Sequence, residues 1–126
     1  MNKRLTIIFL MLCISNVRAE WELVGFSGDG NRKHFVEPAS KQSGQRPKVW
    51  AITDYKVPQH GNAASVKIRY EANCTGKVIR IVSIAAYDGH MGRGKVLSSA
   101  DTTSAWSDLP AGSSNEAIFD FLCSGK

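Results

Sequence analysis

The chain has 126 residues, three cysteines and a formal net charge of +5 at pH 7. After the first twenty residues, no stretch approaches the roughly 20 apolar residues of a membrane-spanning helix, so we expect no transmembrane segment. The length supports one domain with a single modest core.

Residues 1–19 have the three parts of a secretory signal peptide: a short basic stretch, an apolar run, and small residues at the positions that signal peptidase reads. We expect cleavage between Ala19 and Glu20. The mature protein is then a single exported domain of residues 20–126.

Cleavage also changes the charge. Lys3, Arg4 and Arg18 leave with the signal peptide and no acidic residue does, so the mature net charge is +2. The basic character of the precursor is therefore no argument for a nucleic-acid partner, and we expect none.

Cys13 offers an alternative, because it follows an apolar run and could be the acylated cysteine of a lipoprotein. The preceding residue of such a site is small, whereas Leu12 is large. Cleavage after Ala19 is the favoured interpretation, and we expect no lipid anchor.

Cys74 and Cys123 are then the two cysteines of an exported protein, which predicts a disulfide between them. Two distant thiols and scattered histidines do not make a zinc site, so we expect no metal. No motif calls for a cofactor.

The first half of the mature chain predicts three strands. Residues 21–26 and 32–37 flank turn-rich residues 27–31, and residues 46–57 are rich in β-branched and aromatic residues. Residues 38–40 are typical of a turn or a single helical turn.

Residues 64–87 predict the central hairpin, with its turn at Thr75-Gly76. Apolar residues alternate with polar ones along the first strand, as expected when one face is buried. If Gly76 takes a positive φ in a two-residue turn, the pairs are fixed. The expected pairs are Cys74 with Lys77, Ala72 with Ile79, Glu71 with Arg80, Tyr70 with Ile81, and Ile68 with Ser83.

The outer face of this hairpin should carry both charged and apolar side chains. An ion pair between Glu71 and Arg80 is expected there. Val78, Val82 and Ile84 should point to the same side, so something covers part of it: another segment of the chain, or a dimer or ligand surface. The binding candidates on this face are Lys67, Arg69 and Arg80.

Residues 88–95 resemble a phosphate-binding loop, since Gly89 and Gly94-Lys95 have the required spacing. The position that should carry a hydroxyl is Val96, and residues 96–99 predict a strand where that site needs a helix. We interpret the segment as a flexible loop between strands.

One helix is predicted near the C-terminus, after a polar linker at residues 101–108. Ser113 and Glu116 have the spacing of a capping box. Most of the helix circumference up to Cys123 is apolar, so it should lie on a sheet and bring Cys123 to Cys74. The expected fold is α+β: a mainly antiparallel sheet of about six strands, with this helix packed on one face and tethered by the disulfide.

Catalytic patterns are weak. His34, His60 and His90 each lie in or beside an expected loop, and none has a carboxylate or cysteine at a catalytic spacing. No nucleophile elbow and no Cys-X-X-Cys motif is present. We expect a non-enzymatic protein; the remaining alternative is a small hydrolase with a site assembled from loops.

Several segments together resemble one family. They are Trp21-Glu22-Leu23-Val24-Gly25, Tyr55-Lys56-Val57-Pro58-Gln59, residues 87–96, the two cysteines and the helix at 117–123. In this order they resemble the surface-adhesin protein E family of Gram-negative bacteria. The resemblance implies a six-stranded antiparallel sheet with a C-terminal helix tied to its concave side.

The resemblance also implies a binding function, since the namesake adhesin attaches to host matrix and serum proteins and is a dimer. We therefore expect an envelope binding module with a protein partner and a possible homodimer. No ligand-binding motif of the family matches residue by residue. The alternative is a periplasmic structural or inhibitor-like protein without a host-binding role.

Overall fold

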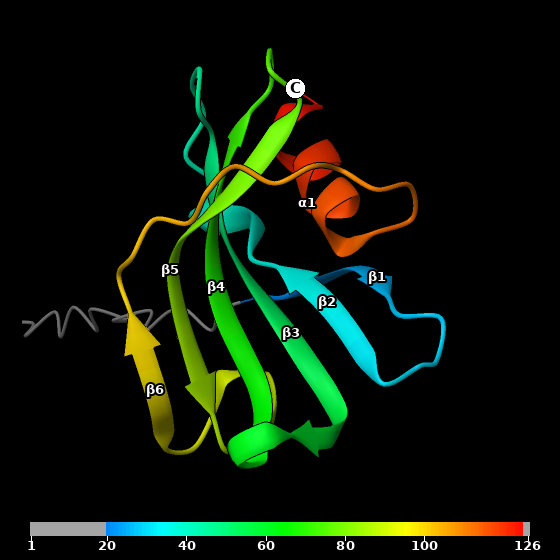
Figure 1. The fold of residues 1–126 in the computed structure, drawn as a ribbon, viewed down its shortest axis with the longest axis vertical. Helices are drawn as coiled ribbons and strands as arrows, with labels where there is room; N and C mark the ends of the chain where they lie inside the picture. Colours follow the sequence, from blue (N-terminus) through cyan, green and yellow to red (C-terminus); the bar gives the residue numbers. More distant parts are fainter. Residues whose placement is uncertain (1–19, 125–126) are drawn as a thin grey trace, which may run out of the picture.

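The computed structural model describes residues 20–124, so the signal peptide expected at residues 1–19 lies outside it. Six strands form one antiparallel sheet in the order β1-β2-β3-β4-β5-β6, and each strand pairs with its neighbours in sequence (Figure 1). The α+β fold class is confirmed. The strands are β1 (Glu22–Phe26), β2 (Arg32–Val36), β3 (Lys48–Gln59), β4 (Ala63–Asn73), β5 (Val78–Tyr87) and β6 (Val96–Ala100), and the helix is α1 (Ser114–Cys123).

Three short 3-10 helices interrupt the connections: η1 (Pro38–Ser40), η2 (His60–Asn62) and η3 (His90–Gly92). The single helical turn expected at residues 38–40 is therefore present. The connection between β5 and β6 contains η3, and the expected strand, β6, follows it. A phosphate-binding loop would need a helix that begins there, so residues 88–95 do not form one.

The register of the central hairpin matches the prediction near its turn. Ala72 pairs with Ile79, Glu71 with Arg80 and Tyr70 with Ile81. The turn itself differs. Strand pairing ends at Asn73, whose side-chain Oδ1 accepts a hydrogen bond of 3.0 Å from the Gly76 N–H. The positive φ of 53° falls on Lys77 and not on Gly76, because four residues close the turn instead of two.

Beyond Tyr70 the predicted register is wrong. A bulge shifts the pairing between Arg69 and Tyr70, so Ile68 lies opposite Ile84 and not opposite Ser83. An extra residue in one strand reverses the alternation of the residues after it. Ile84 therefore packs against the core instead of pointing outward.

Helix α1 covers one face of the sheet, which we call the inner face; the opposite face is the outer face. The capping prediction is confirmed, because the Ser113 side chain accepts a hydrogen bond of 3.1 Å from the Glu116 N–H. Glu116 reaches back to the N–H of Gly112, at 3.2 Å, one residue before the position that a capping box uses.

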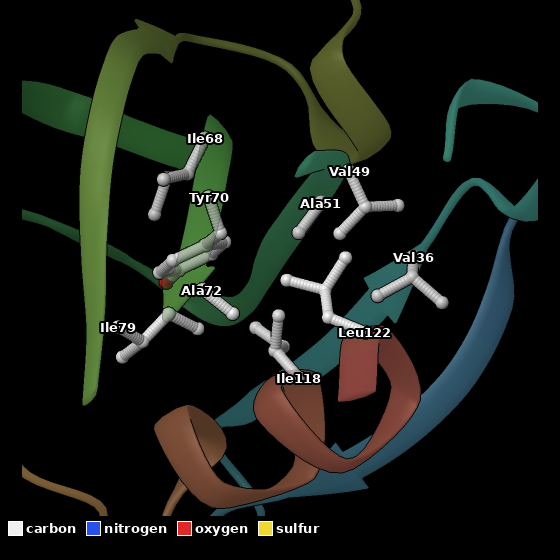
Figure 2. Close-up of a cluster of buried hydrophobic side chains, with 9 residues drawn as sticks. All are labelled: Val36, Val49, Ala51, Ile68, Tyr70, Ala72, Ile79, Ile118 and Leu122. Carbon is white, nitrogen blue, oxygen red and sulfur yellow. The ribbon is translucent and has the colours of Figure 1, made fainter. Parts of the chain in front are cut away.

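The core lies between α1 and the inner face. Ile118 and Leu122 project from the helix toward the sheet, where they meet the side chains of β2 to β5 (Figure 2). Alternate residues of the strands fill this layer, as the pleat requires. The buried sheet residues are Val36, Val49, Ala51, Ile68, Tyr70, Ala72 and Ile79.

A disulfide joins Cys74 to Cys123, with their Cα atoms 5.6 Å apart. It connects the end of α1 to the turn of the β4–β5 hairpin, as predicted. The covalent link holds the helix against the inner face at the end where the chain finishes.

The linker between β6 and α1 runs along the edge of β5 (Figure 1). Ile79 and Ser107 exchange backbone hydrogen bonds of 3.1 and 2.7 Å, and the Ser104 N–H donates to the Ile81 carbonyl at 2.8 Å. This segment has no regular alternation, yet it occupies part of the β5 edge that β6 leaves open.

Candidate functional site: the outer face of the sheet

The outer face carries a cluster of aromatic and cationic side chains. Trp50 of β3 lies directly across from Arg69 of β4 in the sheet. The Lys67 ammonium lies 4.8 Å from the centre of the Trp50 ring, and the Arg69 guanidinium lies 5.9 Å from it. These are cation–π distances, so the indole holds both cations in place. Trp21, just before β1, faces Lys67 at 6.0 Å.

A second part of the cluster lies two residues further along β4, toward the β4–β5 turn, on the same face. Trp106 of the linker packs over Arg80, whose guanidinium is 4.1 Å from the ring centre. Arg80 also donates a hydrogen bond of 2.8 Å to Glu71. All three tryptophans of the chain thus contact cations on the outer face. We call Trp21, Trp50, Trp106, Lys67, Arg69 and Arg80 the outer-face cluster.

Glu71 is the acidic centre of this face. Its carboxylate binds Arg80 at 2.6 Å and Lys48 at 3.4 Å, while only 5% of the residue is exposed. Burial acts to raise the Glu71 pKa, but the hydrogen bonds and charges of Arg80 and Lys48 outweigh it, and the pKa is lowered. The predicted ion pair is present, but its carboxylate is buried, and Trp106 lies over the Arg80 guanidinium.

Charge is unevenly spread across the cluster. Within residues 20–124, Lys67 and Arg69 have no acidic partner within 4 Å, whereas Arg80 is neutralised by Glu71. The three candidates from the sequence therefore separate into a free pair and a structural arginine. The free pair, which contacts the Trp50 ring, gives this part of the face a positive charge.

The β5–β6 connection folds over the rest of the outer face. The Ser65 hydroxyl donates to the Gly89 carbonyl at 2.6 Å and accepts from the Gly92 N–H at 2.9 Å. Asp54 accepts from the Met91 N–H at 2.8 Å. These bonds contradict the expected flexible loop. Another segment of the chain thus covers part of the outer face, as one of the two alternatives predicted.

Comparison with known proteins identifies the fold family. The family model described as surface-adhesin protein E matches residues 21–124. The chain belongs to the surface-adhesin protein E family. The match spans the whole sheet and the helix, so the outer-face cluster lies within the family domain.

Solved structures of Haemophilus influenzae protein E share this surface-adhesin E fold. A crystal form II structure has a TM-score of 0.61 at 17% identity, and covers 86% of this chain and 91% of its own. A selenomethionine form has a TM-score of 0.60 at 16% identity, covering 87% and 90%. A structure from a non-typeable strain scores 0.59 at 16%, covering 87% and 79%. A search of the curated proteins found no match.

The three histidines of this surface-adhesin E chain lie in three different surroundings. His34 is half-buried beside the Thr53 hydroxyl at 3.0 Å, and burial followed by the charge of Arg32 lowers its pKa. His60 is exposed in η2. His90 lies 3.3 Å from the Asp54 carboxylate, a pairing that the sequence did not suggest because 36 residues separate them.

The His90–Asp54 pair lacks a nucleophile in a reactive arrangement. Ser65 is the cross-strand partner of Asp54, but its hydroxyl is fully buried and donates its proton to the Gly89 carbonyl. A serine nucleophile needs the histidine as its base, and Ser65 does not contact His90 in this way. The contacts of Asp54 with His90 and with the Met91 N–H join η3 to β3.

Two further features concern only residues 20–124. In this part of the chain, no helix is long and apolar enough to cross a membrane. The same residues contain no group of three or more histidine, cysteine or acidic side chains arranged to hold a metal ion.

The sequence favours core or rim packing for the three tryptophans, with an exposed one as a candidate interface anchor, and it does not predict that they share one cluster. Trp21 comes from just before β1, Trp50 from β3 and Trp106 from the linker. The strand order that brings them onto one face is not visible in any one segment. Strand alternation offered one usable signal, since Trp50 falls at a position opposite in phase to the core residues Val49 and Ala51.

Proposed function

We propose that this protein is a non-enzymatic envelope binding module that contacts a protein partner through the outer-face cluster. The observation that carries the proposal is the contact of Trp50 with both Lys67 and Arg69 on the sheet face that α1 does not cover. Tryptophan and arginine are the residues most often found as energetic anchors of interfaces.

The geometry favours a partner with an acidic surface. Within residues 20–124, Lys67 and Arg69 bring positive charge without a carboxylate in ion-pair distance. Charge complementarity speeds the encounter of two proteins and fixes their relative position. Their contacts with the indole restrict the two side chains before binding, which reduces the ordering entropy lost on association. Host matrix and serum proteins are the partners that membership of an adhesin family suggests.

We further propose that residues 1–19 direct export and are removed between Ala19 and Glu20, so that residues 20–126 form one domain. Display on the outer-membrane surface would place the cluster in reach of host proteins. The alternative location is the periplasm, where the module would have a structural or inhibitory role.

A second copy of the chain is the other partner that we propose. β1 and β6 each pair with one neighbouring strand, and all five residues of β6 are exposed. An unpaired strand edge is a template for another strand. Light scattering of the purified protein tests this: a mass of one chain at all concentrations contradicts a dimer.

The binding proposal is tested by surface plasmon resonance with the purified mature protein and a panel of extracellular-matrix and serum proteins. Lys67→Gln with Arg69→Gln should weaken any saturable interaction by about 10-fold or more, with loss at high salt. Lys77→Gln, which removes the same kind of charge at the β4–β5 turn, is the matched control. Equal binding by the double variant and the control would overturn the role of the cluster.

Location needs its own experiment. Protease added to intact cells should degrade the protein if it is displayed on the surface. Protection until the outer membrane is opened would favour the periplasmic alternative.

A further inference from the structure

A recess opens on the outer face, away from the tryptophans. It lies beside the ends of β2 and β3, where the β1–β2 turn and η3 form its rim, and it has a volume of about 480 Å³. This size is within the range of pockets that bind small molecules. The lining residues are Gly30, Asn31, Lys33, Asp54, Lys56 and His90.

One wall of the recess is fixed by Asn31. Its backbone carbonyl accepts from the Lys56 N–H at 2.7 Å, and its side-chain oxygen accepts from the Val57 N–H at 2.9 Å. The Asn31 N–H donates to Asp29 at 2.9 Å. Because the side-chain oxygen is already used, the Asn31 side-chain amide NH₂ is the group left to donate to a ligand.

The opposite wall is fixed by Asp54. Its Oδ1 accepts from the Met91 N–H at 2.8 Å and faces His90 Nδ1 at 3.3 Å. A carboxylate can only accept, so His90 carries a proton on Nδ1 and keeps Nε2 for another partner. Within residues 20–124, Asp54 Oδ2 has no hydrogen-bond partner and remains an acceptor.

The loop that presents His90 has little freedom. Gly94 has a φ of 82°, and a Cβ at this position would collide with the Asp88 carboxylate, which accepts from the Lys95 N–H at 2.7 Å. Met91 has a φ of 56°, a backbone angle that residues other than glycine rarely adopt. A backbone held in such a conformation by its neighbours keeps the recess in one shape.

Charge decides what the recess can hold. Lys33 lies opposite Asp54 in the β2–β3 register, and Lys56 follows Asp54 on the same face of β3. Within the described residues, neither lysine has a carboxylate within 4 Å. The recess thus contains two ammonium groups, from Lys33 and Lys56, and the amide donor of Asn31. Its single carboxylate, Asp54, already uses one oxygen in hydrogen bonds.

We propose that this recess binds a sugar carrying an anionic group: a carboxylate, a sulfate or a phosphate. The anionic group sits between Lys33 and Lys56, where charge-assisted hydrogen bonds are strongest. A neighbouring sugar hydroxyl donates to Asp54 Oδ2, and the Asn31 amide donates to a ring or hydroxyl oxygen. Inorganic sulfate has no hydroxyl for Asp54 and is repelled by it, so an acidic sugar binds more tightly than sulfate does.

The test is isothermal titration calorimetry of the mature protein with five probes: glucuronic acid, N-acetylglucosamine 6-sulfate, glucose 6-phosphate, glucose and sodium sulfate. We expect at least one anionic sugar to bind with a Kd of about 1 mM or lower. Glucose should not bind, and sodium sulfate should bind more weakly than the sugar. The three anionic sugars separate the carboxylate, sulfate and phosphate sources of the charge.

Variants connect the binding to the recess. Lys33→Met and Lys56→Met should each weaken the best sugar by about 10-fold, whereas Lys77→Met, at the β4–β5 turn, should leave it unchanged. The side-chain amide signal of Asn31 in nitrogen–proton NMR spectra should shift on addition of the sugar. The proposal is overturned by no binding of any anionic sugar, by equal binding of sodium sulfate, or by recess variants that bind like the control.

Discussion

At the scale of single residues, Glu71 is the side chain on which the outer face depends most. Its carboxylate is buried and bound by Arg80 and Lys48, and Trp106 closes over Arg80. Strand alternation predicted the pairing with Arg80 but assigned it to a solvated face. Trp106, which lies over Arg80, belongs to the irregular linker between β6 and α1. No periodic pattern in the sequence predicts where such a segment will lie.

Replacing Glu71 by Gln should reduce the free energy of unfolding at pH 7 by about 1–3 kcal/mol, because two cations lose their buried partner. Urea denaturation measures the loss. Glu22→Gln removes an exposed carboxylate from β1 and is the matched control, with an expected change near zero. A Glu71 variant as stable as the control would mean that the pair is energetically neutral.

The same residue predicts a pH dependence. The Glu71 pKa is lowered in the folded protein, so its contribution is complete above the ordinary carboxyl pKa of about 4 and is lost as the pH falls through the lowered folded value. The stability difference between wild type and Glu71→Gln should therefore shrink as the pH is taken from 7 to 3. A difference that stays constant over this range contradicts the lowered pKa.

At the scale of elements, the helix and the central hairpin show what local patterns can predict. The cap at Ser113 and the apolar faces of α1 follow from residues within one segment, so both were predictable. The bulge between Arg69 and Tyr70 was not, because no glycine or proline marks it in residues 78–87. Because of this bulge, Ile84 points toward the core and not toward the outer face. One extra residue in β5 thus changed which side chains lie on each face of the sheet.

Ser113→Ala should lower the stability of the protein by about 1 kcal/mol, since the Glu116 N–H at the start of α1 loses its acceptor. Thermal or urea unfolding measures this change. Ser113→Asp keeps an oxygen at the same place and is the control, expected to match the wild type within a few tenths of a kcal/mol. Equal losses in both variants would show that the hydroxyl matters for packing and not for capping.

At the scale of the whole molecule, the disulfide connects the sheet and the helix. With Cys13 assigned to the signal peptide, Cys74 and Cys123 allowed only one disulfide. This predicted long-range contact placed the helix against the central hairpin. The candidate site was less predictable, because its tryptophans and the His90–Asp54 pair meet only when all six strands are in order. Strand alternation alone predicted that Lys67 and Arg69 lie on the outer face, but it did not predict that the Trp50 indole contacts both.

Replacing both Cys74 and Cys123 by Ser should lower the free energy of unfolding by about 2–4 kcal/mol, since the bond spans 49 residues and restricts the unfolded chain. Urea denaturation with and without a reducing agent measures it. The double variant should not respond to the reducing agent, whereas the wild type should lose stability toward the value of the variant. A wild type that is unaffected by complete reduction contradicts the stabilising role.

Helix α1 is the last described element of the chain, and it supplies Ile118 and Leu122 to the core. A chain that ends before residue 114 keeps all six strands but leaves Val49, Ala72 and Ile79 without a cover. Such a sheet exposes a contiguous apolar surface to water and is prone to self-association. Chains that terminate early at about residue 113 should accumulate as aggregates, not as soluble fragments.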